Sequence, residues 1–180
     1  KGCRGFLFSW AAFPFSNFRR KPKELEFKSL SNKSFKNCFS FQKVLMFSFC
    51  IPTEFVFGSG SFKKLYQYRM PGKKALIVTT NGGSVKRLGY LNELEKQLEK
   101  SDVSFEVFDG IEPNPITDNI MAAAAKAKET NCDFVIGFGG GSPMDSAKLI
   151  ALAATNPGNI WDYCQKGTGG RKQPENTPLP

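Results

Sequence analysis

The sequence predicts an α/β fold in which a parallel sheet is covered by helices on both faces. Three short apolar runs, at residues 75–79, 104–108 and 134–138, recur at intervals of about thirty residues, the length of one strand-and-helix unit. Between them, apolar residues are spaced by three and four, which is typical of amphipathic helices. Short apolar strands that alternate with such helices form parallel sheets buried on both sides.

Residues 50–57 (CIPTEFVF) precede this pattern. Their β-branched and aromatic alternation predicts an edge strand entered through Pro52, and the glycine-rich residues 58–60 predict the turn that follows. Ligands of parallel sheets bind beyond the carboxyl ends of the strands. The loops after Thr79, Phe108 and Phe138 are therefore expected to carry the function.

Two helices are predicted between the three apolar runs. The apolar stripe of the first is formed by Leu88, Leu91, Leu94 and Leu98. The second is alanine-rich and covers residues 116–130. It is entered through Asn114 and Pro115, and Asn131 is expected to be its C-cap.

The third loop, residues 137–148 (GFGGGSPMDSAK), has the features of an anion site. Its three consecutive glycines permit positive φ and allow a ligand to approach the backbone closely. Ser142 is a favourable N-cap, Pro143 suits the first helical position, and Asp145 would then close a capping box. The unpaired amides and the positive end of the helix dipole would accept a diphosphate.

Spacing alone leaves this loop open to two interpretations. It lacks the Gly-Lys-Ser/Thr of a nucleotide triphosphatase loop, and it misses the Rossmann fingerprint because Ser142 stands in place of the third glycine. A tight structural turn explains the glycines as well as a nucleotide site does. The carboxylate of Asp145 would repel a phosphate placed on it, so it would cap the helix or contact an uncharged part of the ligand.

The charge of the 180-residue chain is concentrated in its first quarter. The total is +9, but residues 1–45 hold 10 Lys+Arg and 2 Asp+Glu, whereas residues 46–180 hold 15 and 14 and are nearly neutral. The chain contains no histidine, which excludes catalytic triads and metal sites that depend on imidazole.

Residues 1–45 are basic and rich in phenylalanine, without lasting periodicity. We expect a disordered or non-native leader, namely upstream sequence translated in frame, with Met46 as the true start. A targeting peptide, or an arm that stacks aromatic rings on nucleic acid, remains an alternative. Five cysteines without a CxxC pair suit the reducing cytoplasm, and no apolar run approaches the length of a membrane span.

Four stretches, in order and spacing, resemble a known family. GGGSPMDSAK (139–148) closely resembles the cofactor-binding motif of the iron-containing, or type III, alcohol dehydrogenases. The other three stretches are FSFCIPTEFVFGSG (47–60), KKALIVTTNGGSVKRLG (73–89) and FDGIEPNPITDNI (108–120). The resemblance implies that residues 46–180 are the truncated N-terminal, Rossmann-like cofactor domain of an NAD(P)-dependent oxidoreductase. Such an enzyme interconverts a primary alcohol and an aldehyde by metal-assisted hydride transfer.

The resemblance also implies which residues bind the cofactor. The stretch from Gly140 to Met144 would hold the diphosphate, and the whole set is Thr80, Asn81, Asn114, Gly139, Gly140, Gly141, Ser142, Pro143, Met144 and Asp145. The alternative for Asn114 is a turn residue before Pro115, and Asp145 with Lys148 is explained equally well as a helix cap or a solvated ion pair. Many members carry an Asp that selects NAD where this chain has Thr80 and Asn81, so the neutral loop favours NADP.

The resemblance implies that the metal centre lies outside this chain. The family's ligands, one Asp and three His, belong to a C-terminal helical domain, so neither metal ligands nor catalytic residues are carried over. We therefore expect a fragment that is inactive alone, cut before a threonine-rich loop beyond Pro180. The complete protein is expected to be a homodimer acting on a small alcohol or aldehyde, without nucleic-acid or membrane partners.

Two rival interpretations remain open. One is a non-catalytic nucleotide- or nucleic-acid-binding module that uses the basic aromatic arm, for which affinity would fall steeply with salt. The other is that the fragment does not fold, because its sheet would expose an unpaired edge.

Overall fold

The computed structural model describes residues 53–81 and 83–180. Three strands, β1 (Lys74–Thr80), β2 (Ser104–Ile111) and β3 (Phe134–Gly137), form a parallel sheet in the order β2-β1-β3. The helices are η2 (Ser61–Gln67), α1 (Ser84–Arg87), α2 (Tyr90–Lys100), α3 (Thr117–Glu129), α4 (Gly141–Thr155) and η3 (Ile160–Tyr163). The predicted α/β class and its three strands are confirmed. The predictions for residues 1–45 lie outside the described residues.

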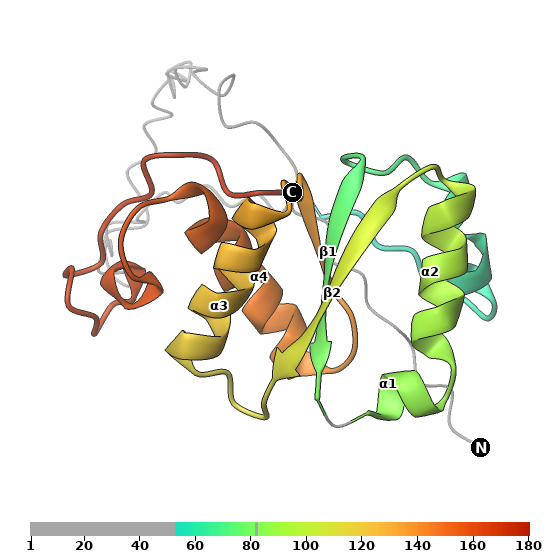
Figure 1. The fold of residues 1–180 in the computed structure, drawn as a ribbon, viewed down its shortest axis with the longest axis horizontal. Helices are drawn as coiled ribbons and strands as arrows, with labels where there is room; N and C mark the ends of the chain where they lie inside the picture. Colours follow the sequence, from blue (N-terminus) through green and yellow to red (C-terminus); the bar gives the residue numbers. More distant parts are fainter. Residues whose placement is uncertain (1–52, 82) are drawn as a thin grey trace, which may run out of the picture.

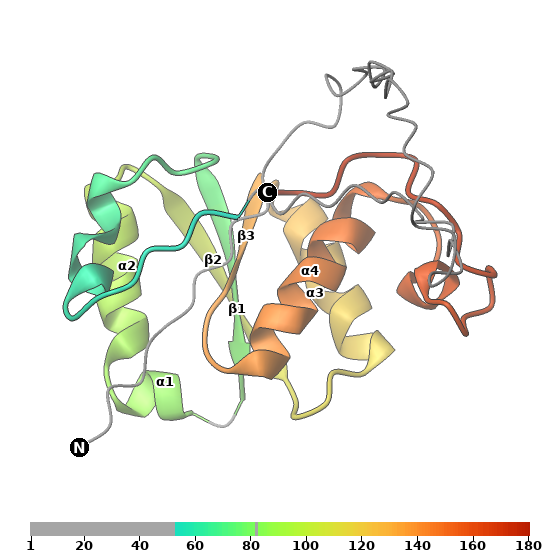
Figure 2. The same ribbon diagram turned by 180° about the vertical axis from the view of Figure 1, so that it is seen from behind.

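Helices cover both faces of the sheet, with α2 on one side and α3 and α4 on the other (Figures 1 and 2). The central strand β1 is buried on both faces, because its alternate side chains enter two separate cores. Ala75 and Ile77 enter the first, and Leu76 and Val78 enter the second. This explains why residues 75–78 are all apolar rather than alternating.

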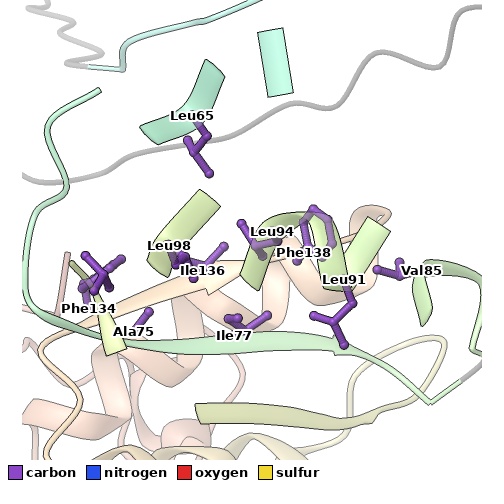
Figure 3. Close-up of a cluster of buried hydrophobic side chains, with 11 residues drawn as sticks. Leu65, Ala75, Ile77, Val85, Leu91, Leu94, Leu98, Phe134, Ile136 and Phe138 are labelled. Carbon is purple, nitrogen blue, oxygen red and sulfur yellow. The ribbon is translucent and has the colours of Figure 1, made fainter. Parts of the chain in front are cut away.

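The first core lies between the sheet and α2 (Figure 3). Leu91, Leu94 and Leu98 are almost fully buried there, as their spacing predicts. Each such burial stabilises the fold by about 1.5–3 kcal/mol. Phe62 of η2 stacks on Phe138, just beyond β3, with ring centroids 5.6 Å apart, so η2 covers the same face.

The second core brings α3 and α4 together through small side chains. Ala123, Ala124 and Ala127 of α3 are buried with Ile150 and Ala153 of α4. Small residues let the two helices approach each other and the sheet closely. The alanine-rich composition of α3 is therefore a packing requirement as well as a helix preference.

Three local predictions about these elements are wrong. Of the edge strand predicted over residues 50–57, the described residues 53–57 form no strand, and Phe55 and Phe57 are 64% and 80% exposed. Alternation predicts which face a strand would bury but supplies no backbone partner. Leu88 is 59% exposed because Gly89, at φ 75°, separates α1 from α2. At the end of α3, Thr130 is the C-cap, and Asn131 follows it in the left-handed region with φ 54°.

The C-terminal segment returns to the sheet and lies beside β3. The N–H of Val135 donates to the carbonyl of Pro180 (2.8 Å), and the N–H of Leu179 donates to that of Ala151 (3.1 Å). Buried Asn156 fixes the residues that lead to this contact, because its Oδ1 accepts hydrogen bonds from the backbone N–H groups of residues 175 and 176, both at 2.8 Å.

Candidate functional site

The strand order fixes where a ligand would bind. From β1 the chain crosses to β2 on one side, and it then returns to β3 on the other side of β1. Ligands of open parallel sheets bind beyond the carboxyl ends of the strands, at the point where the order reverses. Here that point lies between β1 and β3, and α1, α3 and α4 all begin at that end of the sheet (Figures 1 and 2).

The glycines of the loop after β3 fall into two groups. A Cβ on Gly137 would lie 2.9 Å from the carbonyl oxygen of Pro143, and one on Gly139 would lie 3.0 Å from the Cγ of Pro143. Both glycines are needed for the loop to pack on α4. By contrast, a Cβ on Gly140 or Gly141 would meet nothing within 4 Å. The space above these two residues is open.

The predicted capping box is wrong, because α4 begins earlier than expected. Gly140 is the N-cap in an extended conformation, Gly141 is the first helical residue, and no side chain caps the helix. Ser142 and Asp145 therefore lie inside the helix. Consecutive glycines let the backbone turn into the helix without a capping side chain. Pro143 is still accommodated, since the first amides of a helix have no partner within it.

The N-terminus of α4 is electrostatically suited to an anion. Its first turn carries no acidic side chain. Asp145 lies further along and pairs with Lys148 at 3.2 Å, with both side chains mostly exposed. The solvated pair foreseen for these two residues is confirmed, and the contact of Asp145 with cofactor stays a prediction. Unpaired amides and the helix dipole face the open space over Gly140.

The loop after β1 lies beside this helix terminus. A Cβ on Gly139 would be 3.8 Å from the Cγ2 of Val85 in α1 and 4.0 Å from the Oγ1 of Thr79 in β1. Thr80 ends β1 and Asn81 follows it, with its N–H bonded to the carbonyl of Ile111 at 3.2 Å. Both therefore lie at the same end of the sheet as the glycine loop.

Asn114 lies in the loop after β2, on the far side of β1 from the glycines. It is exposed and has a left-handed backbone with φ 60°. Such a conformation is typical of a turn residue. Its contact with a cofactor remains a prediction.

Sequence reasoning missed two buried hydroxyl groups. Thr79 in β1 and Ser146 in α4 are both 0% exposed, and their hydroxyl oxygens have no hydrogen-bond partner in the described part of the chain. An unpaired buried hydroxyl costs about 1–3 kcal/mol. Thr79 occupies an inward position of its strand, in line with Ala75 and Ile77, so its place in the sequence does not distinguish it from a core residue.

Sequence reasoning also missed an acidic group at the same end of the sheet as Thr80. Asp109 on β2 accepts a hydrogen bond from the ammonium group of Lys86 on α1. This bond is the main reason why the pKa of Asp109 lies below its ordinary value. The carboxylate is therefore ionised and paired at neutral pH.

The family described as iron-containing alcohol dehydrogenase matches residues 52–180. The chain belongs to the iron-containing alcohol dehydrogenases. The chain is 35% identical over 120 residues to the probable NADH-dependent butanol dehydrogenase 1 of Bacillus subtilis, with 67% of this chain and 31% of that protein covered. It is 38% identical over 128 residues to the NADPH-dependent aldehyde reductase of Escherichia coli, with 70% and 32% covered.

Solved structures of alcohol dehydrogenases agree with the fold. The NADH-dependent butanol dehydrogenase A of Thermotoga maritima matches with a TM-score of 0.61 and 32% identity, over 68% of this chain and 30% of that one. The chain thus spans about a third of the length of the relatives it matches. Each of these three relatives is named as a dehydrogenase or reductase that depends on NADH or NADPH.

The residues present do not fit an iron site. Residues 53–81 and 83–180 contain no group of three His, Cys, Asp or Glu side chains placed to hold a metal ion, and the full sequence has no histidine. Within the same residues, no helix has the length and apolar character needed to cross a bilayer.

Proposed function

We propose that the glycine loop and the first turn of α4 bind the diphosphate of NAD or NADP. The observation that carries this proposal is the open space over Gly140 and Gly141, at a helix terminus without an acidic first turn. The backbone amides there would donate to phosphate oxygens. Thr80, Asn81, Asn114, Gly139, Ser142, Pro143, Met144 and Asp145 are the further residues that we assign to this site.

The proposed role is that of the cofactor part of an oxidoreductase that interconverts a primary alcohol and an aldehyde. The bound dinucleotide supplies the hydride acceptor or donor. The chain's own part is to bind and orient it, by the α4 amides on the diphosphate and by the loop after β1 on the adenosine ribose. For the complete protein we propose a homodimer, which rests on the family resemblance.

Substitution of Gly140 tests the diphosphate site. Gly140 has φ −84°, which any residue adopts, so Gly140→Val should fold while its side chain fills the space that the diphosphate needs. We expect titration with NADH or NADPH, followed by nicotinamide fluorescence, to show binding to the unaltered chain and at least about a tenfold loss in the variant. Ala125→Val, exposed on α3, is the matched control. Unchanged binding to Gly140→Val would mean that the loop is misassigned.

We further propose that binding lies within residues 46–180 and that the 180-residue chain alone does not turn over alcohol. The absence of histidine and of a metal-ligand group among the described residues supports the second statement. Oxidation of butan-1-ol by the purified chain, after metal removal and return of iron, would contradict it. Loss of dinucleotide binding on deletion of residues 1–45, with a steep salt dependence, would favour the nucleic-acid-arm alternative.

The neutral loop after β1 favours NADP over NAD. Thr80 and Asn81 carry no charge that would repel a 2′-phosphate. The expected result is a lower dissociation constant for NADPH than for NADH, and the reverse order would contradict this preference.

A further inference from the structure

A β-bulge lies at the carboxyl end of β2, next to the proposed ribose site. Val78 pairs with Phe108, but Thr80 pairs with Ile111, so two residues of β2, Asp109 and Gly110, lie opposite one residue of β1. A bulge redirects the side chains of the strand that carries it and is frequent beside active sites. Here the bulge lies opposite Thr79 and moves Ile111 to the core that holds Val78, whereas Asp109 stays on the face of Phe105 and Val107, which α1 and α2 cover.

The carboxylate of Asp109 is paired with the helix that follows the loop after β1. Asp109 accepts a hydrogen bond from Lys86, and the two side chains are 52% and 47% exposed. Lys86 belongs to α1, which directly follows the loop that begins at Asn81. The ion pair therefore bridges the end of β2 and the helix after β1, at the end of the sheet where Thr80 lies.

Both members of this pair can recognise the adenosine ribose, but the carboxylate would favour NAD and the ammonium group would favour NADP. A carboxylate at this place in a dinucleotide-binding fold accepts hydrogen bonds from the ribose hydroxyls and repels a 2′-phosphate, whereas a basic side chain accommodates that phosphate. A lysine ammonium binds a phosphate as a compact charge with three donors. Here the carboxylate comes from the neighbouring strand, and Lys86 already neutralises it.

We infer that the Lys86–Asp109 pair sets the coenzyme preference, with Lys86 as the partner of the 2′-phosphate of NADP and Asp109 as its competitor. The inference rests on the proposed dinucleotide site. When a 2′-phosphate binds, Lys86 turns from the carboxylate toward it, or shares its donors between the two. When NAD binds, the pair stays closed and its charge is internally balanced.

The test is the ratio of the dissociation constants of NADH and NADPH, measured by fluorescence titration of the full chain. In Lys86→Gln, Asp109 is left unpaired, so we expect NADPH binding to weaken by about tenfold while NADH binding changes little. In Asp109→Asn, Lys86 loses its competitor, so NADPH binding should tighten by about threefold or more. Because the pair is half exposed, neither variant should unfold the domain.

Lys74→Gln is the matched control. Lys74 also pairs with an acid of β2, Glu106 at 3.9 Å, but it lies at the opposite end of β1. Its loss should leave the ratio unchanged. An unchanged ratio in both Lys86→Gln and Asp109→Asn overturns the inference and leaves the proposed function intact. Failure of the unaltered chain to bind either nucleotide overturns both.

Discussion

Substitution of Gly137 by alanine tests how β3 packs on α4. The added Cβ would lie 2.9 Å from three atoms, the Cβ of Ala147, the Cα of Met144 and the carbonyl oxygen of Pro143. Carbon atoms normally approach to about 3.5–4.0 Å. Two of these atoms belong to the helix backbone and cannot yield by a change of rotamer, so the strand and the helix must separate by roughly 0.6 Å or more.

The expected cost of Gly137→Ala is at the upper end of that found for overpacked cores, about 3 kcal/mol. With a urea dependence of about 2 kcal/mol per M, the unfolding midpoint would fall by about 1.5 M. Urea unfolding followed by circular dichroism measures this midpoint. Gly140→Ala, where the Cβ meets nothing within 4 Å, is the control and should cost less than about 1 kcal/mol. Equal midpoints for the two variants would refute the packing described for β3 and α4.

Three further predictions concern buried or paired polar groups. Thr79→Val removes an unpartnered hydroxyl at constant volume and should raise the free energy of unfolding by about 1 kcal/mol in the same urea assay; a loss of stability would show that the hydroxyl has a partner. Asn156→Ala leaves two backbone N–H groups without their acceptor and should cost about 2 kcal/mol, with faster amide exchange at residues 175 and 176 as its local signature. Because its pKa is lowered in the fold, Asp109 stabilises the protein above the unperturbed Asp value of about 3.9 and loses that effect as pH falls through the folded value. Asp109→Asn should remove this part of the acid sensitivity, at most about 1 kcal/mol, and an unaltered pH dependence of unfolding would contradict the pairing.

The sequence was sufficient for the strands and for the helix faces, because hydrophobic spacing reports burial directly. Leu91, Leu94 and Leu98 show this for α2. It was less informative at element ends. The start of α4 was misplaced because capping preferences describe isolated helix termini, whereas three glycines allow the helix to begin before Ser142.

The features of the candidate site that could not be predicted from the sequence depend on contacts between residues far apart in the chain. Thr80 and Asn81 carry no acid, but Asp109 of the neighbouring strand lies at the same end of the sheet, opposite Thr79. No local pattern encodes which residues of two strands lie side by side. The same holds for Thr79, whose position in the strand is ordinary and whose unpaired hydroxyl is a property of the packed loop.

The contact of the C-terminal segment with β3 also bears on self-association. An exposed strand edge offers unpaired N–H and C=O groups to any extended peptide, including another copy of the same chain. At β3 one of these donors, the N–H of Val135, is taken by the carbonyl of Pro180, and the proline ring itself has no N–H with which to extend a ladder. Loss of the hydrogen bonds that Asn156 accepts would therefore do more than lower stability. It would leave the outer edge of β3 exposed and able to pair with a strand of another chain.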